Sequence, residues 1–599
     1  MVQQGHVTIL AGRTRRLWQP LLQQLRIADQ LGGRCLLIVP EHYTLQAERA
    51  LISDLGANGL LSIEVLSPSR LVQRVRDRAG AGPRLPIDDL GRSMTVMRAL
   101  EKSRTDLWFY YSAASFPGFS PKLARVISAM KEAGIGPDTL QDGIAEWPEG
   151  ALQSKLHDTA QVYSAYQELL AGQFADPDDQ MQDVRKRLAD SQLFQGHHVF
   201  VYGFDMFTTR LCDLIASLAP QAAHTLVTIV SDRAQAPDGE AFAPVRESTQ
   251  RLMDTLQLRG IDHRFVWADE EAINAPPDVQ HLERNALNPM RPVFRQGVHG
   301  VRLYAAPSPY GEVRNAAENI AAALRRGTPP SRIMVLCGNF TRYAGLIASS
   351  FRDYGIPLYI AEKHPLTGHG MIRATLSALR CISDGWRRED VLAYLKSGFS
   401  SLSEQDVWTL ETYANAYGIG GNRWRKPFDR GPEEARQAAE LLRLALVTPL
   451  MTLHQALLKA VSATESIQAV LDFLYETQAD ARILQLEQKL LNDGLPEQAI
   501  RTRQVWGRLC AMFEQMYALL EGARIPIGRF ADWLEAGLAA KEISALPASA
   551  ECVQCGEIGR LIPDEPHVLV LMGLNDGILS GVQEELLTDR EVTDAEQRL

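Results

Sequence analysis

The sequence has few cysteines, no excess of positive charge and no long apolar run, and each absence excludes a class of protein. Seven cysteines scattered over 599 residues do not make a disulfide framework and fit thiols in a reducing compartment, so we expect a cytoplasmic protein. A formal net charge of −10 excludes a globally basic surface, so any contact with nucleic acid must come from local basic patches. No stretch approaches the roughly 20 apolar residues that cross a bilayer, and we expect no membrane association.

The chain is too long for a single hydrophobic core, because one core stops growing at roughly 250–300 residues. Short apolar runs alternate with amphipathic helical patterns, which is typical of parallel α/β sheets. Long helical patterns then interrupt this alternation twice. The predicted strands form a first group at 6–11, 34–39, 61–66, 199–202, 225–230 and 263–266, and a second group at 301–305, 333–337, 358–360 and 567–572.

Two α/β groups, each interrupted by helices, predict an α/β fold with two RecA-like parallel-sheet cores, as in a superfamily 1 helicase, each carrying a helical insertion. We predict the first core at 1–80 and 195–290 with its insertion at 81–194. The second core is predicted at 298–372 and 541–599, with its insertion at 373–540. No closing element is visible before Leu599, so we expect a fragment.

A motor of this architecture needs a glycine-rich loop that ends in Lys and Ser/Thr, which hold phosphates and magnesium. Residues 12–19, GRTRRLWQ, place Leu, Trp and Gln where the second glycine, the Lys and the Ser/Thr are needed. The strand at 199–202 ends in Tyr202 instead of a magnesium-binding carboxylate, and Asp205 comes three residues later. We therefore predict no ATP hydrolysis. What remains is a degenerate nucleotide site at Gly12 and Arg13, with a residual phosphate contact, or a solvated turn that carries Arg13, Arg15 and Arg16.

A basic stripe follows the third predicted strand. Ser67 can cap a helix and Pro68 suits its first position, so we expect a helix here with free N–H groups at its start. Three arginines at i, i+4 and i+8 share one face of this helix and suit DNA phosphates or a guanine edge; they are Arg70, Arg74 and Arg78. From spacing alone, a solvated helix face is the simpler alternative.

Other patterns that could carry chemistry favour structural roles. The CxxC pair Cys552 and Cys555 is a weak metal signal by itself. The histidines, His197-His198 and His364 with His369 among them, lack zinc spacing. Asp176, Asp178 and Asp179 are predicted to lie at the start of a helix, where carboxylates favour the helix dipole. The cluster Arg423-Trp424-Arg425-Lys426 could stack on or grip a DNA strand, but we favour a structural role in which Trp424 anchors a helical insertion. We name no catalytic residue and no metal ligand.

The order and spacing of short motifs resemble the AddB family, also called RexB, the second subunit of the AddAB helicase-nuclease. No single motif is diagnostic, but together they span nearly the whole chain. They are Gly12-Arg13, Val39-Pro40-Glu41 with Thr44, Ser67-Pro68-Ser69-Arg70-Leu71, Pro117-Gly118-Phe119, Gly203-Phe204 with Phe207-Thr208, Gly311-Glu312-Val313, Asp353-Tyr354-Gly355-Ile356-Pro357 and Gly573-Leu574-Asn575-Asp576-Gly577.

The resemblance implies partners and a binding strip. It implies a heterodimer with an AddA-type motor and nuclease subunit, DNA ends and single-stranded DNA as ligands, and a search of the 3′-ended strand for the recombination signal Chi. Thr44, Arg70 and Phe207 keep the family's residue type, whereas the family's amide and two stacking aromatics are replaced in the rest of the strip. The whole strip maps onto His42, Thr44, Pro68, Arg70, Gln73 and Phe207.

The family's cofactors are ATP with magnesium and a 4Fe-4S cluster. In the family, the cluster's cysteines and a C-terminal nuclease domain lie beyond the segment that corresponds to Leu599. The resemblance therefore implies that this chain lacks the nuclease domain, and we expect no cofactor in it. We expect a DNA-end-binding, helicase-like but ATPase-inactive subunit of a complex that processes double-strand breaks for homologous recombination. Two alternatives stay open. One is an active helicase or nuclease with unrecognised motifs, and the other is a scaffold that holds a motor subunit without touching DNA.

Overall fold

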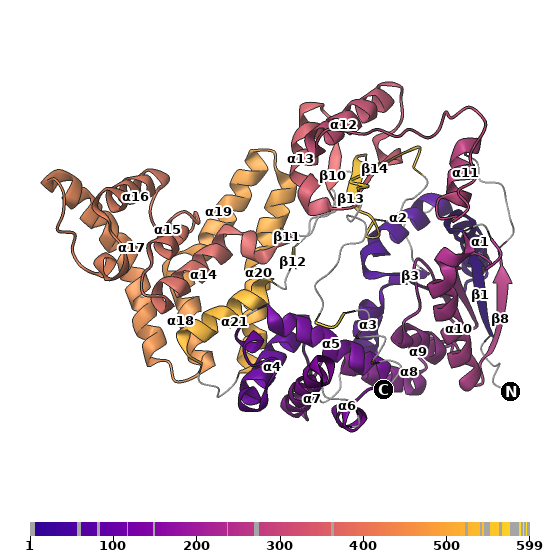
Figure 1. The fold of residues 1–599 in the computed structure, drawn as a ribbon, viewed down its shortest axis with the longest axis horizontal. Helices are drawn as coiled ribbons and strands as arrows, with labels where there is room; N and C mark the ends of the chain where they lie inside the picture. The colour runs from indigo at the N-terminus through magenta and orange to yellow at the C-terminus, as the bar shows by residue number, and fades with distance from the viewer. Residues whose placement is uncertain are drawn as a thin grey trace. The chain divides into compact units, whose positions relative to one another are not determined.

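The computed structural model contains two parallel β-sheets and many helices (Figure 1). This confirms the predicted α/β class. The structure describes residues 6–595 except 57–61, 81–83, 117, 146, 148–149, 237, 269–274, 361–363, 521–524, 540–541, 544–550, 562–565, 576–585, 589–590 and 592–594.

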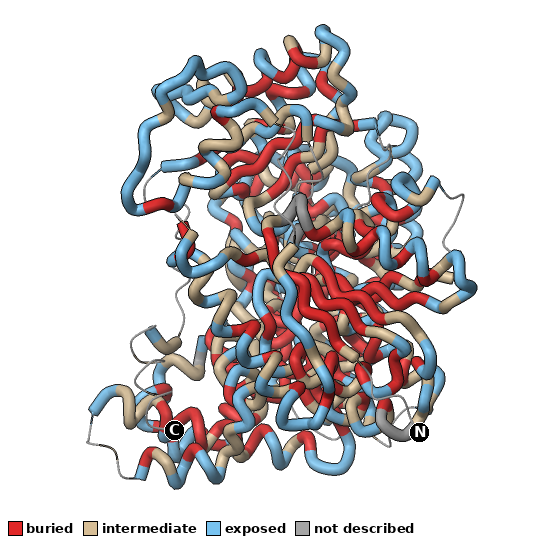
Figure 2. Tube along the Cα trace, turned by 90° about the vertical axis from the view of Figure 1, so that its right-hand side faces the viewer, coloured by how far each residue is buried: buried red, intermediate tan, exposed pale blue. Residues whose placement is uncertain are grey.

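The first sheet has six strands in the order β3-β2-β6-β7-β1-β8, and every pairing in it is parallel. Side chains alternate between its two faces, as in any strand. Both faces of its inner strands are buried, which is the rule for parallel sheets. Buried segments lie in the middle of the view in Figure 2. The strands are β1 (His6–Gly12), β2 (Cys35–Ile38), β3 (Ile63–Leu66), β6 (His198–Val201), β7 (His224–Val230) and β8 (Asp262–Trp267).

Helices cover both faces of this sheet. One face, which includes Leu37 and Phe200, packs against α1 (Thr14–Gln30) and α2 (Thr44–Leu55). The other face, which includes Ile38, packs against the remaining helices of this core. These are α3 (Pro68–Ala79), α8 (Pro177–Ser191), α9 (Thr209–Leu218) and α10 (Ala243–Leu258).

The second sheet has four parallel strands in the order β10-β13-β9-β14. One face packs against α12 (Pro309–Arg325) and α13 (Phe340–Asp353). The strand predicted at 301–305 is wrong, because these residues form no strand and Leu303 is 98% exposed. The four strands are β9 (Ile333–Cys337), β10 (Leu358–Ile360), β13 (Val553–Glu557) and β14 (Val568–Met572).

A clasp holds the connection between the two sheets. Helix α11 (Pro277–Asn285) carries Asp278 in its first turn. One oxygen of this carboxylate, Oδ2, accepts the N–H groups of His299, Gly300 and Val301 at 2.7, 2.6 and 3.1 Å. A Cβ on Gly300 would lie 2.8 Å from Val279, so this close approach requires glycine. The connection is therefore fixed to α11.

The remaining helices belong to a second compact unit, which comprises 86–177, 362–550 and 583–599. Residues 86–177 of the first predicted insertion and the second predicted insertion lie in it and share one hydrophobic core, whereas α8, near the end of the first predicted insertion, packs on the first sheet. Arg98 of the first segment donates to the carbonyl oxygen of Leu519 in the second. The first segment has α4 (Asp89–Lys102), α5 (Phe119–Ala133), α6 (Pro137–Ile144) and α7 (Ala151–Leu170), and the second has α14 (Gly370–Ser383), α15 (Arg388–Leu395), α16 (Glu404–Tyr417), α17 (Glu433–Lys459), α18 (Ala463–Glu476), α19 (Ala479–Asn492), α20 (Pro496–Leu519) and α21 (Ile527–Ala539).

Short strands complete the described elements: β4 (Leu85–Pro86), β5 (Phe174–Ala175), and the antiparallel pair β11 (His364–Pro365) and β12 (Glu542–Ile543). Among the described residues, only α17 is long and apolar enough to cross a membrane by length and composition, which corrects the expectation that no such stretch exists. Leu446, Leu450 and Leu453 on this helix are buried in the helical core. The core helix of a globular unit meets the same criterion, so one such helix is weak evidence for a membrane.

Candidate nucleic-acid interface

The predicted binding residues come from four segments of the first sheet. Because its strands are parallel, the segments that follow their carboxyl ends meet at one edge, which is where ligands bind in open α/β sheets. Gly12 and Arg13 follow β1, His42 and Thr44 follow β2, and Phe207 follows β6. The other predicted residues follow β3 and lie on α3; they are Pro68, Arg70, Gln73, Arg74 and Arg78.

The junction between β1 and α1 has no room for a phosphate-binding loop. Strand β1 ends at Gly12 and α1 begins at Thr14, so Arg13 alone separates them. The three positions that a motor would use for its second glycine, Lys and Ser/Thr lie inside the helix. Leu17 is buried, and the Trp18 Nε1–H donates to Asp54 at 2.7 Å. The loop and the two side chains that hold phosphates and magnesium are thus replaced by packed helix.

Arg13 fills the remaining space as an ion-pair hub. Its guanidinium lies 2.8 Å from Asp232, 2.7 Å from Asp238 and 3.3 Å from Glu283, and it also donates to the Glu283 carbonyl at 3.2 Å. The ring of Phe242 lies 5.2 Å away. Burial disfavours the charge, but the bonds to Asp238 and Asp232 raise the pKa of Arg13 above its ordinary value. The positive charge of Arg13 is therefore balanced by carboxylates of the same chain, and this position is not a solvated turn.

Aromatic side chains occupy the edge where a magnesium carboxylate is needed. Tyr202, the residue after β6, is buried. Its ring lies 5.0 Å from Trp18 and 5.7 Å from Tyr43, whereas Asp205 is exposed. No group of three His, Cys, Asp or Glu side chains among the described residues could hold a metal ion. The described residues here thus fit neither nucleotide phosphates nor magnesium.

The start of α3 is built as predicted, except that its N–H groups are occupied. The Ser67 hydroxyl accepts from the Arg70 N–H at 3.3 Å, and Pro68 takes the first helical position. The Ser69 N–H, however, donates to Glu41 at 3.2 Å, and the Ser69 hydroxyl donates to the same carboxylate. The expectation of free N–H groups is therefore wrong. Glu41 occupies the place of an anionic ligand and adds negative charge beside the stripe.

Two arginines of the stripe have no partner in the described part of the chain. Arg70 and Arg78 are exposed, and no hydrogen bond or ion pair is formed by their side chains there. Arg74 is paired with Glu64 at 2.5 Å. Gln73 is exposed next to Arg74. The stripe therefore offers two unpaired cations instead of three.

The rest of the predicted strip is divided between surface and core. His42 is exposed in the short helix that precedes α2. Thr44 is buried and its hydroxyl donates to the Glu41 carbonyl at 3.3 Å. Phe207 is 1% exposed and belongs to the core of the first sheet. A ring in this position has no access to a base, so the predicted DNA contact of the Phe207 side chain does not fit the structure.

Three of the patterns outside the strip are built into the fold. Trp424 is fully buried, and its carbonyl accepts from Arg443 at 3.1 Å. Cys555 is buried in β13, between β10 and β9, and Cys552 is buried just before that strand. The acidic cluster forms ion pairs around the start of α8, with Lys131, Arg210 and Arg84 as partners of Asp176, Asp178 and Asp179. Pro117, Asp576 and Gly577 of the family motifs lie outside the described residues.

The family model described as ADDB, N-terminal, matches residues 9–283. A protein of Pelotomaculum thermopropionicum, named as the B subunit of an ATP-dependent helicase/deoxyribonuclease, is 30% identical over 95% of this chain and 51% of its own length. The chain is a relative of the AddB family. A protein of the same name from Alkaliphilus metalliredigens is 27% identical over 94% of this chain and 52% of its own length. The chain thus spans about half the length of the curated AddB relatives it matches.

Two parts of this site could not be found from local patterns. The partners of Arg13 lie 219 to 270 residues away along the chain, so no spacing rule connects them. Glu41 lies in the motif Val39-Pro40-Glu41, but only the structure shows it bound to the start of α3.

Proposed function

We propose that this chain is the helicase-like, DNA-binding and ATPase-inactive part of an AddB-type subunit. In this proposal its two sheets are RecA-like cores, at 1–80 with 195–290 and at 298–372 with 541–599, with helical insertions at 81–194 and 373–540. The observation that carries the proposal is the junction at Arg13. A nucleotide phosphate placed there would have to displace three carboxylates and find a cation that is already paired. Chemical energy is then supplied by an AddA-type motor partner.

The proposed DNA contact is the exposed face of α3. Arg70 and Arg78 are long, permanently charged side chains that donate to phosphate or to a guanine edge, and His42 and Gln73 are exposed near them in the same strip. Base stacking is worth roughly 1–3 kcal/mol per base, and Pro68 and Gln73 provide no ring for it. We therefore propose that this strip follows the 3′-ended strand through arginine contacts, with a recognised signal that differs from one read by aromatic stacking.

The test is binding of a short fluorescent single-stranded oligonucleotide to the purified chain over a range of salt concentrations. Phosphate contacts give a log affinity that falls linearly with log salt. We expect this behaviour, together with no magnesium-dependent ATP hydrolysis and no strand cleavage. Affinity that does not depend on salt, or no binding at all, favours a scaffold that holds a motor subunit. ATP turnover that is lost on changing Gly12 favours an active motor.

A further inference from the structure

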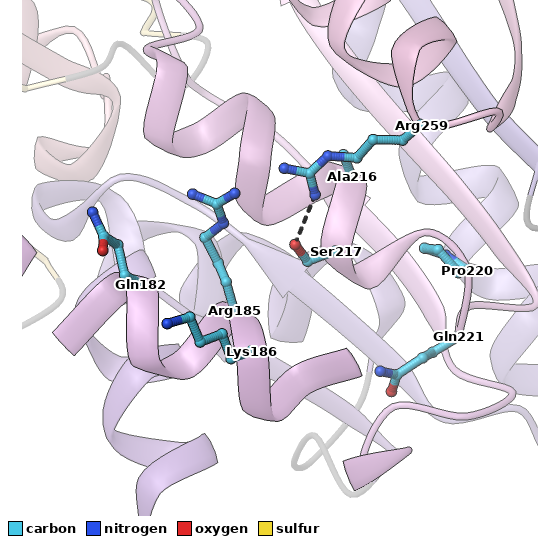
Figure 3. Close-up of a pocket in the computed structure, with 8 residues that line it drawn as sticks. All are labelled: Gln182, Arg185, Lys186, Ala216, Ser217, Pro220, Gln221 and Arg259. Atoms are coloured by element: carbon cyan, nitrogen blue, oxygen red, sulfur yellow. Dashed lines mark hydrogen bonds between the residues drawn. The ribbon is translucent and has the colours of Figure 1, made fainter. Parts of the chain in front are cut away.

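A basic cleft lies between α8 and α9, on the side of the first sheet that packs against α3, α8, α9 and α10. It has a volume of about 550 Å³ and is lined by residues from both helices and from the end of α10. Figure 3 shows Arg185 and Lys186 projecting from α8, and Arg259 reaching over Ser217 of α9. Of the eight lining residues drawn there, three carry positive charge and none is acidic.

One carboxylate serves two of the three cations. Asp213 lies 2.7 Å from the Arg185 guanidinium and is also paired with Arg259. Arg259 donates to the Ser217 hydroxyl at 3.1 Å as well. Lys186 is exposed, and within the described residues its ammonium group has no partner. The cluster therefore keeps a net charge of about +2 in a hollow, which favours an anion.

The arginine N–H groups of the cleft have too few hydrogen-bond acceptors. The buried Nε–H of Arg185 has no hydrogen-bond acceptor among the described residues, although an unsatisfied buried donor is unfavourable. Burial lowers the pKa of Arg185, Asp213 raises it, and the nearby charge of Arg259 lowers it further. A bound oxyanion would accept the free N–H and reduce the repulsion between the two guanidinium groups.

The cleft and the α3 stripe lie at opposite edges of the sheet. Pro220 and Gln221, which line the cleft, lie between the end of α9 and the start of β7, and the Gln221 carbonyl accepts from the N–H of Gly196 just before β6. The cleft therefore lies toward the amino-terminal edge of the parallel strands, whereas α3 begins at the carboxyl-terminal edge. The two basic features are separate.

We propose that the Arg185–Lys186–Arg259 cleft binds the phosphodiester backbone of DNA. The cleft is open to solvent, so a continuous chain can cross it. Arginine forks bind phosphate oxygens in a bidentate way, and lysine adds a point charge. Ser217 and Gln182 supply neutral donors beside them. The proposal does not require the Arg70 stripe to function, because the two surfaces share no residue.

The experiment measures the affinity of the whole chain for a fluorescent duplex oligonucleotide of arbitrary sequence between 50 and 200 mM salt, about the range in which phosphate contacts show their salt dependence. The main variant is Lys186→Glu, because Lys186 is exposed and its replacement breaks no contact with the described residues. The matched control is Arg326→Glu, which makes the same change of charge at an exposed position at the end of α12. Arg259→Gln is the second variant. Thermal unfolding checks that each variant is folded.

We expect Lys186→Glu to reduce affinity about eightfold at 0.1 M salt and to lower the slope of log affinity against log salt by about 0.9, the value of one phosphate contact. Arg259→Gln should act in the same direction, and Arg326→Glu should leave the slope unchanged. Equal losses in Lys186→Glu and Arg326→Glu would overturn the proposal, because they would show a general effect of charge. Unchanged affinity in Lys186→Glu would also overturn it.

A second arm separates DNA from free phosphate. Inorganic phosphate is added at constant ionic strength, and thermal unfolding is followed. Stabilisation by phosphate that Lys186→Glu abolishes, with unchanged DNA affinity, assigns the cleft to a free anion and refutes the DNA proposal. Loss of DNA binding in Lys186→Glu with normal binding in Arg70→Ala supports the cleft alone, whereas the reverse result supports the α3 stripe alone.

Discussion

Removal of the positive charge of Arg13 is the sharpest test of the packed nucleotide position. The substitution Arg13→Met keeps much of the side-chain length and leaves three carboxylates without their cation. Asp238 is the most costly of the three, because its side chain is only 3% exposed, whereas Asp232 and Glu283 are 25% and 30% exposed. Breaking a buried ion pair from one side costs about 3–5 kcal/mol. Since only one partner is fully buried, we expect a loss of about 3 kcal/mol in the free energy of unfolding.

The loss should depend on pH, and its direction follows from the charges. Without Arg13, three negative charges are crowded together in the folded state and not in the unfolded chain, so their repulsion destabilises the fold most where all three are charged. The deficit of Arg13→Met relative to the unchanged chain should therefore be largest at pH 7 and should shrink as the pH falls toward 5.

Urea denaturation followed by tryptophan fluorescence measures this deficit in the transition of the unit that holds both sheets. The control is Arg284→Met, an exposed arginine on α11 next to Glu283, which should change stability by less than about 0.5 kcal/mol. A loss below about 1 kcal/mol for Arg13→Met, or an equal loss at pH 7 and pH 5, would refute the reasoning. So would an ATP-dependent rise in the stability of the unchanged chain.

Three further predictions concern DNA and acid. Glu41→Gln keeps an acceptor for the Ser69 N–H but removes a negative charge near a bound phosphate. At about 6 Å in water, the repulsion between this charge and the phosphate costs roughly 0.7 kcal/mol. Affinity for a single-stranded oligonucleotide should therefore rise about threefold, and a fall would contradict the role of Glu41. Arg70→Ala should weaken the same binding by about 1–3 kcal/mol, and unchanged affinity removes Arg70 from the site. His369 accepts the Met371 N–H through Nδ1, and burial lowers the pKa of His369 to about 4, below the unfolded value of about 6.5. The free energy of unfolding should therefore fall as the pH drops from 6.5 toward 4, by about 2 kcal/mol at pH 5. Urea titrations of the helical unit measure this loss. His369→Asn, which keeps a capping side chain, should lose this dependence, and a variant that retains it would place the effect elsewhere.

Local sequence patterns predicted most of the sheets because each strand and helix is a short periodic element. The error at 301–305 shows the limit of this reasoning. Val301-Arg302-Leu303-Tyr304-Ala305 has the composition of a strand, but a strand forms only if a neighbouring edge is available, and composition contains no information about that edge. In the structure this segment forms no strand and no ladder.

The candidate site likewise combines features that are set by local sequence with features that depend on distant parts of the chain. The cap at Ser67, the helix start at Pro68 and the shared face of Arg70 and Arg78 are local, and they were predictable. The burial of Phe207 was not, because its surroundings are made by α9 and α10, which pack on the same face. The hub at Arg13 was not predictable either, since it depends on carboxylates from distant segments.

The clasp at Asp278 has a mechanical consequence. Helix α11 is held to the first sheet through Glu283 and Arg13, and Asp278 of the same helix grips three successive peptide groups that lead toward α12. The stretch between the sheets is thus held in place at a point where two motor cores that move against each other would need a flexible linker. Freedom of the linker is therefore confined to the residues between Val301 and the start of α12.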